Sequence, residues 1–123
     1  EQNLNASIQV SNLNINWEVP TSYANNATAK RYFLKVGKVL QWNLKAELLM
    51  LSKSPITNKI TVELEFYQNT NKFGIKRMVN SSGVNIVDNV IKDTVNRVLE
   101  MNMNMNMSVF KNLSGNPVLV INL

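Results

Sequence analysis

ITVELEF (60–66), NTNK (69–72) and FGIKRMV (73–79) form the stretch that decides the fold of this chain. Apolar and polar residues alternate in the first and third segments, and a period of two is typical of half-buried strands. The polar segment between them contains asparagines, which tolerate the left-handed backbone that a tight turn needs. The stretch therefore predicts a β-hairpin with strands at Ile60–Phe66 and Phe73–Val79.

The residues after the hairpin predict a helix and then a last strand. Ser81-Ser82-Gly83 ends the second hairpin strand, and residues 84–99 carry apolar side chains at helical spacing. These apolar residues are Val87, Val90, Ile91, Val95, Val98 and Leu99. Asp88 falls in the first turns, where a negative charge complements the helix dipole. After Asn116-Pro117, the segment Val118–Ile121 has the composition of a strong strand.

The N-terminal segment predicts strand structure with one irregularity. Apolar residues occupy even positions from Leu4 to Val10 and odd positions from Leu13 to Val19. Because neighbouring side chains on a strand point to opposite faces, this change of phase predicts either a β-bulge in one edge strand or two separate strands. Residues 20–22 end this region, and 25–26 are expected to continue as loop.

Residues 27–51 predict the longer of two helices. Its apolar side chains, which fall near one face, are Tyr32, Phe33, Val36, Val39, Leu40, Leu44, Leu48 and Leu51. Asn26 or Thr28 is expected to cap its start. Gly37 lies inside, where glycine costs about 1 kcal/mol relative to alanine, so a bend or close packing is expected there. The lysines of the other face fit either a core helix with solvated charges or a helix on a membrane surface.

Length and composition predict a single domain over residues 1–123, with an N-terminal strand extension (1–26) and a core (27–123). The hydrophobic fraction of 45% and charged fraction of 17% are ordinary for a globular protein. The net charge of +5 is compatible with an acidic partner, anionic lipid or nucleic acid. Lysine and arginine are scattered without a nucleic-acid-binding motif, which argues against nucleic acid. No stretch has the length and apolarity of a transmembrane segment.

The residue types present argue against an enzyme. The chain has no Cys and no His, which excludes thiol nucleophiles, Ser-His triads, the usual zinc sites and disulfides. Glu63 and Glu65 share the polar face of a strand, but nothing indicates the cleft that would separate their pKa values for acid–base work. A solvated strand face is the expected environment of both. No catalytic constellation, cofactor or metal site of ordinary type is predicted.

The segment EMNMNMNM (100–107) is the least usual part of the sequence. On a strand, its four methionines would share one face; they are Met101, Met103, Met105 and Met107. Clustered thioethers can bind Cu(I), although a flat strand would set them about 6–7 Å apart. The alternative is that methionine fills an irregular apolar surface, either inside the fold or as an adaptable contact surface.

The hairpin–helix–strand order resembles the C-terminal domain of TonB and its relative TolA. The likeness covers Lys59 to Leu123 and rests on the hairpin, the Ser-Ser-Gly break at 81–83, Asp88 near the helix start and the last strand. Tyr32 in a preceding helix also resembles the first helix of that family. The resemblance implies an α+β fold, in which an antiparallel sheet of three to five strands packs against two helices.

The resemblance also implies a non-enzymatic domain of the bacterial envelope, periplasmic or secreted, from which a signal peptide or anchor has been removed. Such domains capture an extended peptide from a partner protein by adding it to a sheet edge as a strand. The first candidate edge is the last strand, with Val118, Leu119, Val120 and Ile121, and the second is the methionine segment. If the N-terminal strand (Ile8–Trp17) covers the last strand instead, that edge is blocked.

Two alternatives stay open beside strand addition. The first is a secreted structural or host-interaction protein that forms a homodimer through its edge strands and the methionine stripe. The second is a periplasmic Cu(I)-binding protein that uses the same methionines.

Overall fold

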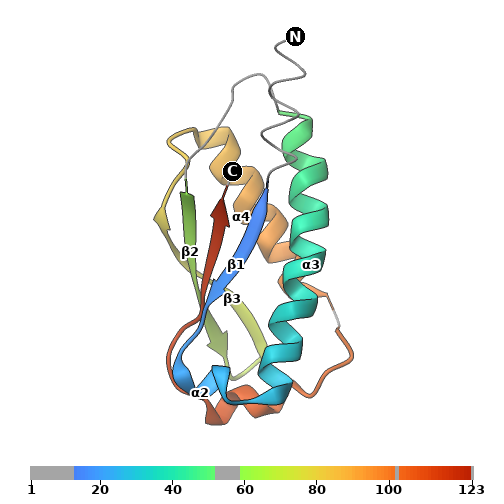
Figure 1. Ribbon diagram of the computed structural model, residues 1–123, viewed down its shortest axis with the longest axis vertical. Helices are drawn as coiled ribbons and strands as arrows, with labels where there is room; N and C mark the ends of the chain where they lie inside the picture. The colour runs from blue at the N-terminus through green and yellow to red at the C-terminus, as the bar shows by residue number, and fades with distance from the viewer. Residues whose placement is uncertain (1–12, 52–58, 102, 123) are drawn as a thin grey trace.

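A computed structural model describes residues 13–51, 59–101 and 103–122 of the chain. Its strands are β1 (Asn14–Glu18), β2 (Lys59–Tyr67), β3 (Lys72–Asn80) and β4 (Val118–Asn122). Its helices are α2 (Thr21–Ala24), α3 (Ala27–Leu49), α4 (Asn85–Glu100) and the 3-10 helix η1 (Met107–Asn112). The predicted α+β class is confirmed, because four antiparallel strands form one sheet against the two long helices (Figure 1).

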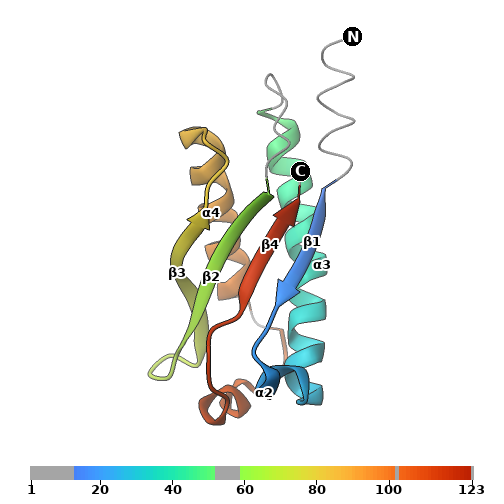
Figure 2. The same ribbon diagram turned by 60° about the vertical axis from the view of Figure 1, so that its left-hand side comes forward.

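The strand order is β1-β4-β2-β3, and every neighbouring pair is antiparallel. Figure 2 shows both long helices behind the strands, with α3 behind the β1 side of the sheet and α4 behind the β3 side. Among the described residues, no helix covers the front face. The fold therefore has two layers, and its core lies between the sheet and the pair of helices.

Alternation along β2 places its apolar side chains in that core. Ile60, Val62 and Leu64 are fully buried, and the register sets the first two beside Ile121 and Leu119 of β4. The helices contribute the apolar faces that their periodicity predicts. Part of the core is an aromatic cluster to which the hairpin, α2, α3 and η1 contribute. Its rings belong to Tyr23, Tyr32, Phe33, Phe66, Phe73 and Phe110.

The predicted hairpin is confirmed, and both strands are longer than the alternation alone indicates. Asn71 adopts the left-handed backbone expected in the turn, with φ 54°. Two register irregularities occur along the pair, and one of them makes Lys76 an extra residue beside Arg77. Gly74 lies opposite Glu65, and a Cβ at this position would collide with the ring of Tyr67 unless that ring moved.

The Ser-Ser-Gly break is tied to the first turn of α4 by hydrogen bonds. The Ser82 backbone N–H and hydroxyl both donate to Asp88 Oδ1, at 2.9 and 2.7 Å. The Ser82 hydroxyl oxygen in turn accepts from the Val84 N–H at 3.1 Å, and Gly83 takes a positive φ of 81°. Asp88 is buried. This aspartate therefore joins the end of β3 to the start of α4, in addition to complementing the helix dipole.

The prediction that the last strand is a sheet edge is wrong. β4 pairs with β1 on one side and β2 on the other. Val118, Leu119, Val120 and Ile121 form a continuous apolar run, and such a run is typical of a central strand. The alternative expectation is the correct one, since Asn14–Glu18 of the N-terminal segment covers this edge. The predicted strand over 4–10 and its change of phase lie outside the described residues.

Two further expectations are corrected. The methionine segment is not a strand: within its described residues, bends precede η1, and Asn104 has a positive φ of 55°. The expected loop after Pro20 contains the short helix α2, whose first turn is formed by hydrogen bonds from the Tyr23 and Ala24 N–H groups to the Pro20 carbonyl. Asn26 caps α3 as expected, accepting from the Ala29 N–H at 3.0 Å.

Candidate functional site

The outer strands of the sheet are β3 and β1, and the two edges differ in character. β3 carries three basic residues, Lys72, Lys76 and Arg77, together with the register irregularities of the hairpin. Charged side chains and bulges are the devices by which natural proteins prevent edge-to-edge pairing. The β3 edge is therefore poorly suited to accept another strand.

The β1 edge has the opposite character. Its pairing with β4 runs without irregularity over five residues, and the strand (NINWE) contains no basic residue. Its side chains alternate, with Ile15 and Trp17 directed to the helix layer and packed against the core. The outward side of this strand faces no other strand among the described residues. Its unpaired backbone groups can therefore template a further strand.

An apolar groove lies between β1 and α3, and it consists of two adjoining hollows of about 300 and 140 Å³. Trp17, Phe33 and Leu34 line both hollows. The other lining residues are Ile15, Val19, Tyr23, Lys30, Gly37, Lys38 and Gln41. We call this surface the β1 groove. Recognition by strand addition combines main-chain hydrogen bonds at an edge with pockets for alternate side chains, and the β1 groove sets both features side by side.

Close packing fixes the wall of the β1 groove. The ring of Trp17 lies 4.7 Å from that of Phe33, measured between centroids. A Cβ at Gly37 would lie 3.1 Å from Trp17 Nε1. The absence of a side chain at this position of α3 therefore lets the indole pack closely against the helix. This contact confirms the close packing expected at Gly37. The buried Nε1–H of Trp17 has no hydrogen-bond partner in the described structure.

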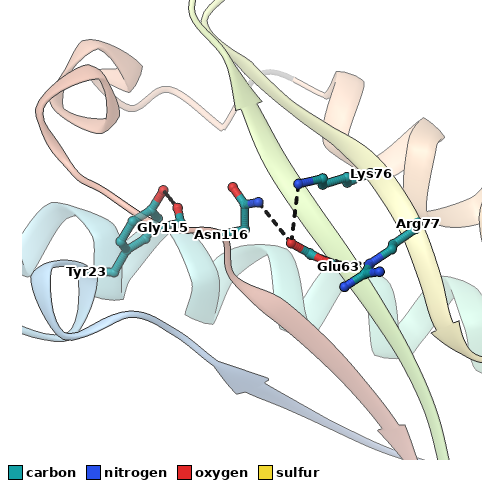
Figure 3. Close-up of polar contacts among 6 residues, drawn as sticks. All are labelled: Tyr23, Glu63, Lys76, Arg77, Gly115 and Asn116. Atoms are coloured by element: carbon teal, nitrogen blue, oxygen red, sulfur yellow. Dashed lines mark hydrogen bonds and ion pairs between the residues drawn. The ribbon is translucent and has the colours of Figure 1, made fainter.

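The sequence predicts a solvated strand face for Glu63. In the structure its carboxylate lies instead in a polar network on the open face of the sheet (Figure 3). Its carboxylate accepts from Asn116 Nδ2 at 2.9 Å and from Arg77 Nε at 2.8 Å, with Lys76 Nζ at 3.9 Å. These hydrogen bonds, that from Asn116 first, lower the pKa of Glu63 below its ordinary value of 4.5. Beside this network, the Tyr23 hydroxyl donates to the Gly115 carbonyl at 2.9 Å. The hydrogen bonds to Asn116 and to Gly115 anchor the loop that leads into β4. We therefore assign the network a structural role.

The lowered pKa of Glu63 predicts a pH effect on stability. A carboxylate with a depressed pKa in the folded state stabilises the fold above its unfolded pKa, and this contribution is lost as pH falls through the folded pKa. The loss is therefore expected at pH values below the ordinary 4.5. We expect Glu63→Gln to flatten the acid side of the stability profile, measured as urea unfolding midpoints against pH. Asn116→Ala is the partial control, and an unchanged profile in Glu63→Gln would contradict the assignment.

The four methionines of the segment 101–107 line a single pocket of about 320 Å³. Met103, Met105 and Met107 are half-buried and packed against the core, whereas Met101 is exposed. The other lining residues are Tyr32, Asn71, Lys72, Leu99 and Glu100. This packing fits methionine as an adaptable filler. The Cu(I) hypothesis stays a prediction, and the ammonium of Lys72, paired with Glu100 at 2.8 Å, lies in the same lining.

Other kinds of site find no support within the residues described. No group of three or more His, Cys, Asp and Glu side chains is placed to hold a metal ion there. None of the helices in that part of the chain combines the length and apolarity needed to cross a bilayer. Comparisons with models of protein families, with curated proteins and with solved structures find no match.

Sequence reasoning did not find the β1 groove, although its components were visible. The helix periodicity places Phe33 in the core, while Leu34 beside it has no predicted partner. The alternation of apolar residues predicts only that Trp17 belongs to a strand. The signal that could have joined them is Gly37, a small residue that permits a close approach to α3.

Proposed function

We propose that this chain is a non-enzymatic protein-interaction domain that binds an extended partner segment as an additional strand on the free edge of β1. The observation that carries the proposal is the regular edge of β1, which has no basic residue and lies beside an apolar groove. The physical basis is that the edge supplies main-chain hydrogen bonds and the groove buries every second side chain of the partner. The mode of binding is the one implied by the TonB/TolA resemblance, but on a different strand from the one first expected.

The chemistry of the groove defines the partner segment. Its apolar walls, including Trp17 and Leu34, favour large apolar side chains at alternate positions. Lys30 and Lys38 lie at its rim on α3 and are exposed. A partner segment with an acidic residue at either end of an alternating apolar stretch would pair with these ammonium groups. We infer an extended, acidic-apolar peptide rather than a folded helix.

The setting follows from the same resemblance. We propose a periplasmic or secreted location in a bacterial envelope, where an extended segment of an envelope protein would be the natural partner. The hairpin, the helix α4 and the preceding helix α3 support the likeness, since they occur here in the order on which it rests.

Hydrogen exchange of a peptide complex tests the proposal. Peptides of alternating apolar and polar residues, with and without terminal acidic residues, are titrated against the labelled full chain. In the free protein, the outward amides of β1 exchange rapidly because they have no strand partner. We expect bound peptide to protect these amides and to leave the amides of β3 unchanged. Protection on β3, or on neither strand, would overturn the proposal.

A proline variant adds a second readout. Of Ile15 and Asn16, one N–H points to β4 and the other to solvent, because directions alternate along a strand. The residue whose amide exchanges fast in the free chain is replaced by proline, which an edge strand tolerates there. We expect at least about tenfold weaker peptide binding with an unchanged far-ultraviolet circular dichroism spectrum. Light scattering of the peptide-free chain identifies the homodimer alternative, in which two β1 edges pair with each other.

A further inference from the structure

The solvent-facing side of α3 carries three large apolar side chains in the open. Trp42 is 80% exposed, Leu34 65% and Leu49 40%. At 3.6 residues per turn, these residues and Lys38 and Lys45 between them fall within an arc of roughly 80°. With a rise of 1.5 Å per residue, the stripe is about 22 Å long. We call it the α3 outer face. At helical spacing it lies opposite the buried residues of α3, so it points away from the core.

Basic residues surround these apolar side chains, without carboxylates among them. The exposed cations of the face are Arg31, Lys35, Lys38 and Lys45. The one acidic residue of α3 is Glu47, and its carboxylate is directed to α4, where it lies 3.6 Å from Arg97. Within the described residues, no carboxylate pairs with Lys38 or Lys45. The α3 outer face is therefore apolar at its centre and uniformly positive.

We propose that the α3 outer face binds the surface of an anionic lipid bilayer, with the helix axis parallel to the membrane plane. Helices that lie in the interface have a basic polar surface and Trp or Leu side chains that enter the boundary between headgroups and acyl chains. Trp42 has the indole that is enriched at this depth. Lys38 and Lys45 can bury their methylene stems while their ammonium groups stay among the headgroup phosphates.

Composition favours a lipid surface over a protein partner for this face. Lysine is depleted at protein–protein interfaces, where aromatic residues and arginine are enriched. On the α3 outer face lysine outnumbers arginine, since three of the four cations are lysines. The hollow beside Trp42 is a shallow space of about 280 Å³, lined by Trp42, Lys45, Ala46 and Leu49. Such a shallow surface gives a folded partner little shape complementarity, but acyl chains and mobile headgroups can adapt to it.

This proposal is independent of strand addition, although the two surfaces are neighbours. α3 runs beside β1 in Figure 1, and both Leu34 and Lys38 belong to the β1 groove and to the α3 outer face. Binding through the α3 outer face would hold the β1 edge close to the membrane surface. The test therefore uses the C-terminal half of the face, which does not line the β1 groove.

Sedimentation of the full chain with lipid vesicles tests the proposal. Vesicles of phosphatidylcholine are compared with vesicles in which about a third of the lipid is phosphatidylglycerol, at low and high salt. We expect at least about tenfold stronger binding to the anionic vesicles, weakened by salt because exposed charges are screened. Trp42→Gln is expected to reduce binding at least about fivefold, and Lys45→Glu at least about tenfold.

Matched variants on α4 serve as controls. Ile86→Gln removes an exposed apolar side chain, as Trp42→Gln does on α3. Lys92→Glu reverses an exposed charge, as Lys45→Glu does. We expect both to bind anionic vesicles within about twofold of wild type. Equal binding to both kinds of vesicle, no binding, or equal losses in the control variants would each overturn the proposal. Peptide binding by Trp42→Gln is expected to stay normal, so failure of one proposal is distinguishable from failure of the other.

Discussion

Replacing Phe110 with alanine is expected to lower the free energy of unfolding by about 3–5 kcal/mol, the usual cost of deleting a buried phenylalanine ring. Phe110 is buried, and its ring lies 4.9 Å from that of Phe73 and 5.3 Å from that of Tyr32, between centroids. These partners belong to β3 and α3, so one ring fastens η1 to both layers of the fold. Because small domains are stable by about 5–15 kcal/mol, the variant should lie close to its unfolding threshold.

Urea unfolding followed by circular dichroism measures this loss. Phe66→Ala is the matched control, since Phe66 belongs to the same cluster but is only half-buried. We expect a clearly smaller effect there, because part of its ring stays exposed to water in the folded state. An effect of Phe110→Ala no larger than that of Phe66→Ala would contradict the central place of Phe110 in the aromatic core.

The parts of the fold with local periodicity could be predicted from the sequence. The hairpin, α3 and α4 each repeat an apolar spacing over several turns or pleats, and that spacing directly reflects a buried face. The predicted helix over 27–51 and the observed helix Ala27–Leu49 begin at the same residue. The last strand is predicted at Val118–Ile121 and observed at Val118–Asn122.

Strand order could not be predicted in the same way, because it depends on contacts between distant segments. β4 becomes central through pairing with Asn14–Glu18, more than ninety residues earlier in the chain. Local alternation does not specify which strand covers which edge. The available signal is the continuous apolar run of β4, which is consistent with a strand whose two faces are both buried, as Leu119, Val120 and Ile121 are here.

The methionine segment shows how alternation can mislead. Its period of two predicts a strand, but Asn104 takes a positive φ, and η1 follows from Met107. Methionine and asparagine both adapt to irregular backbone, since one is flexible and the other tolerates the left-handed region. The sequence contains no comparable signal for Phe110, because the short segment around it repeats no apolar spacing, and this residue reaches the core in the 3-10 helix.

The β1 groove and the α3 outer face both include residues of α3, but they offer different kinds of interaction. The β1 groove combines backbone hydrogen bonds with burial of alternate side chains, so its occupant must be extended. The α3 outer face has no free backbone groups, because a helix satisfies them internally. Its interactions are therefore apolar insertion and long-range charge, which suit a fluid anionic surface. We therefore propose that one face of the domain selects a peptide and the neighbouring face a membrane.

Replacing Asp88 with alanine is expected to lower the free energy of unfolding by about 2–3 kcal/mol. The variant loses two hydrogen bonds to a charged acceptor, those from the Ser82 N–H and hydroxyl. Both bonds involve a buried residue, and a hydrogen bond to a charged group contributes about 1.5–3 kcal/mol. The negative charge in the first turn of α4 would also be lost.

Asp88→Asn separates these contributions, because its amide oxygen can still accept from Ser82 while the charge is removed. We expect the Asn variant to lose about half as much stability as the Ala variant. Hydrogen exchange gives the local readout: the Ser82 amide should exchange much faster in Asp88→Ala than in Asp88→Asn. Equal stability of the Ala variant and wild type, with the Ser82 amide still protected, would show that the junction between β3 and α4 is held by something other than this aspartate.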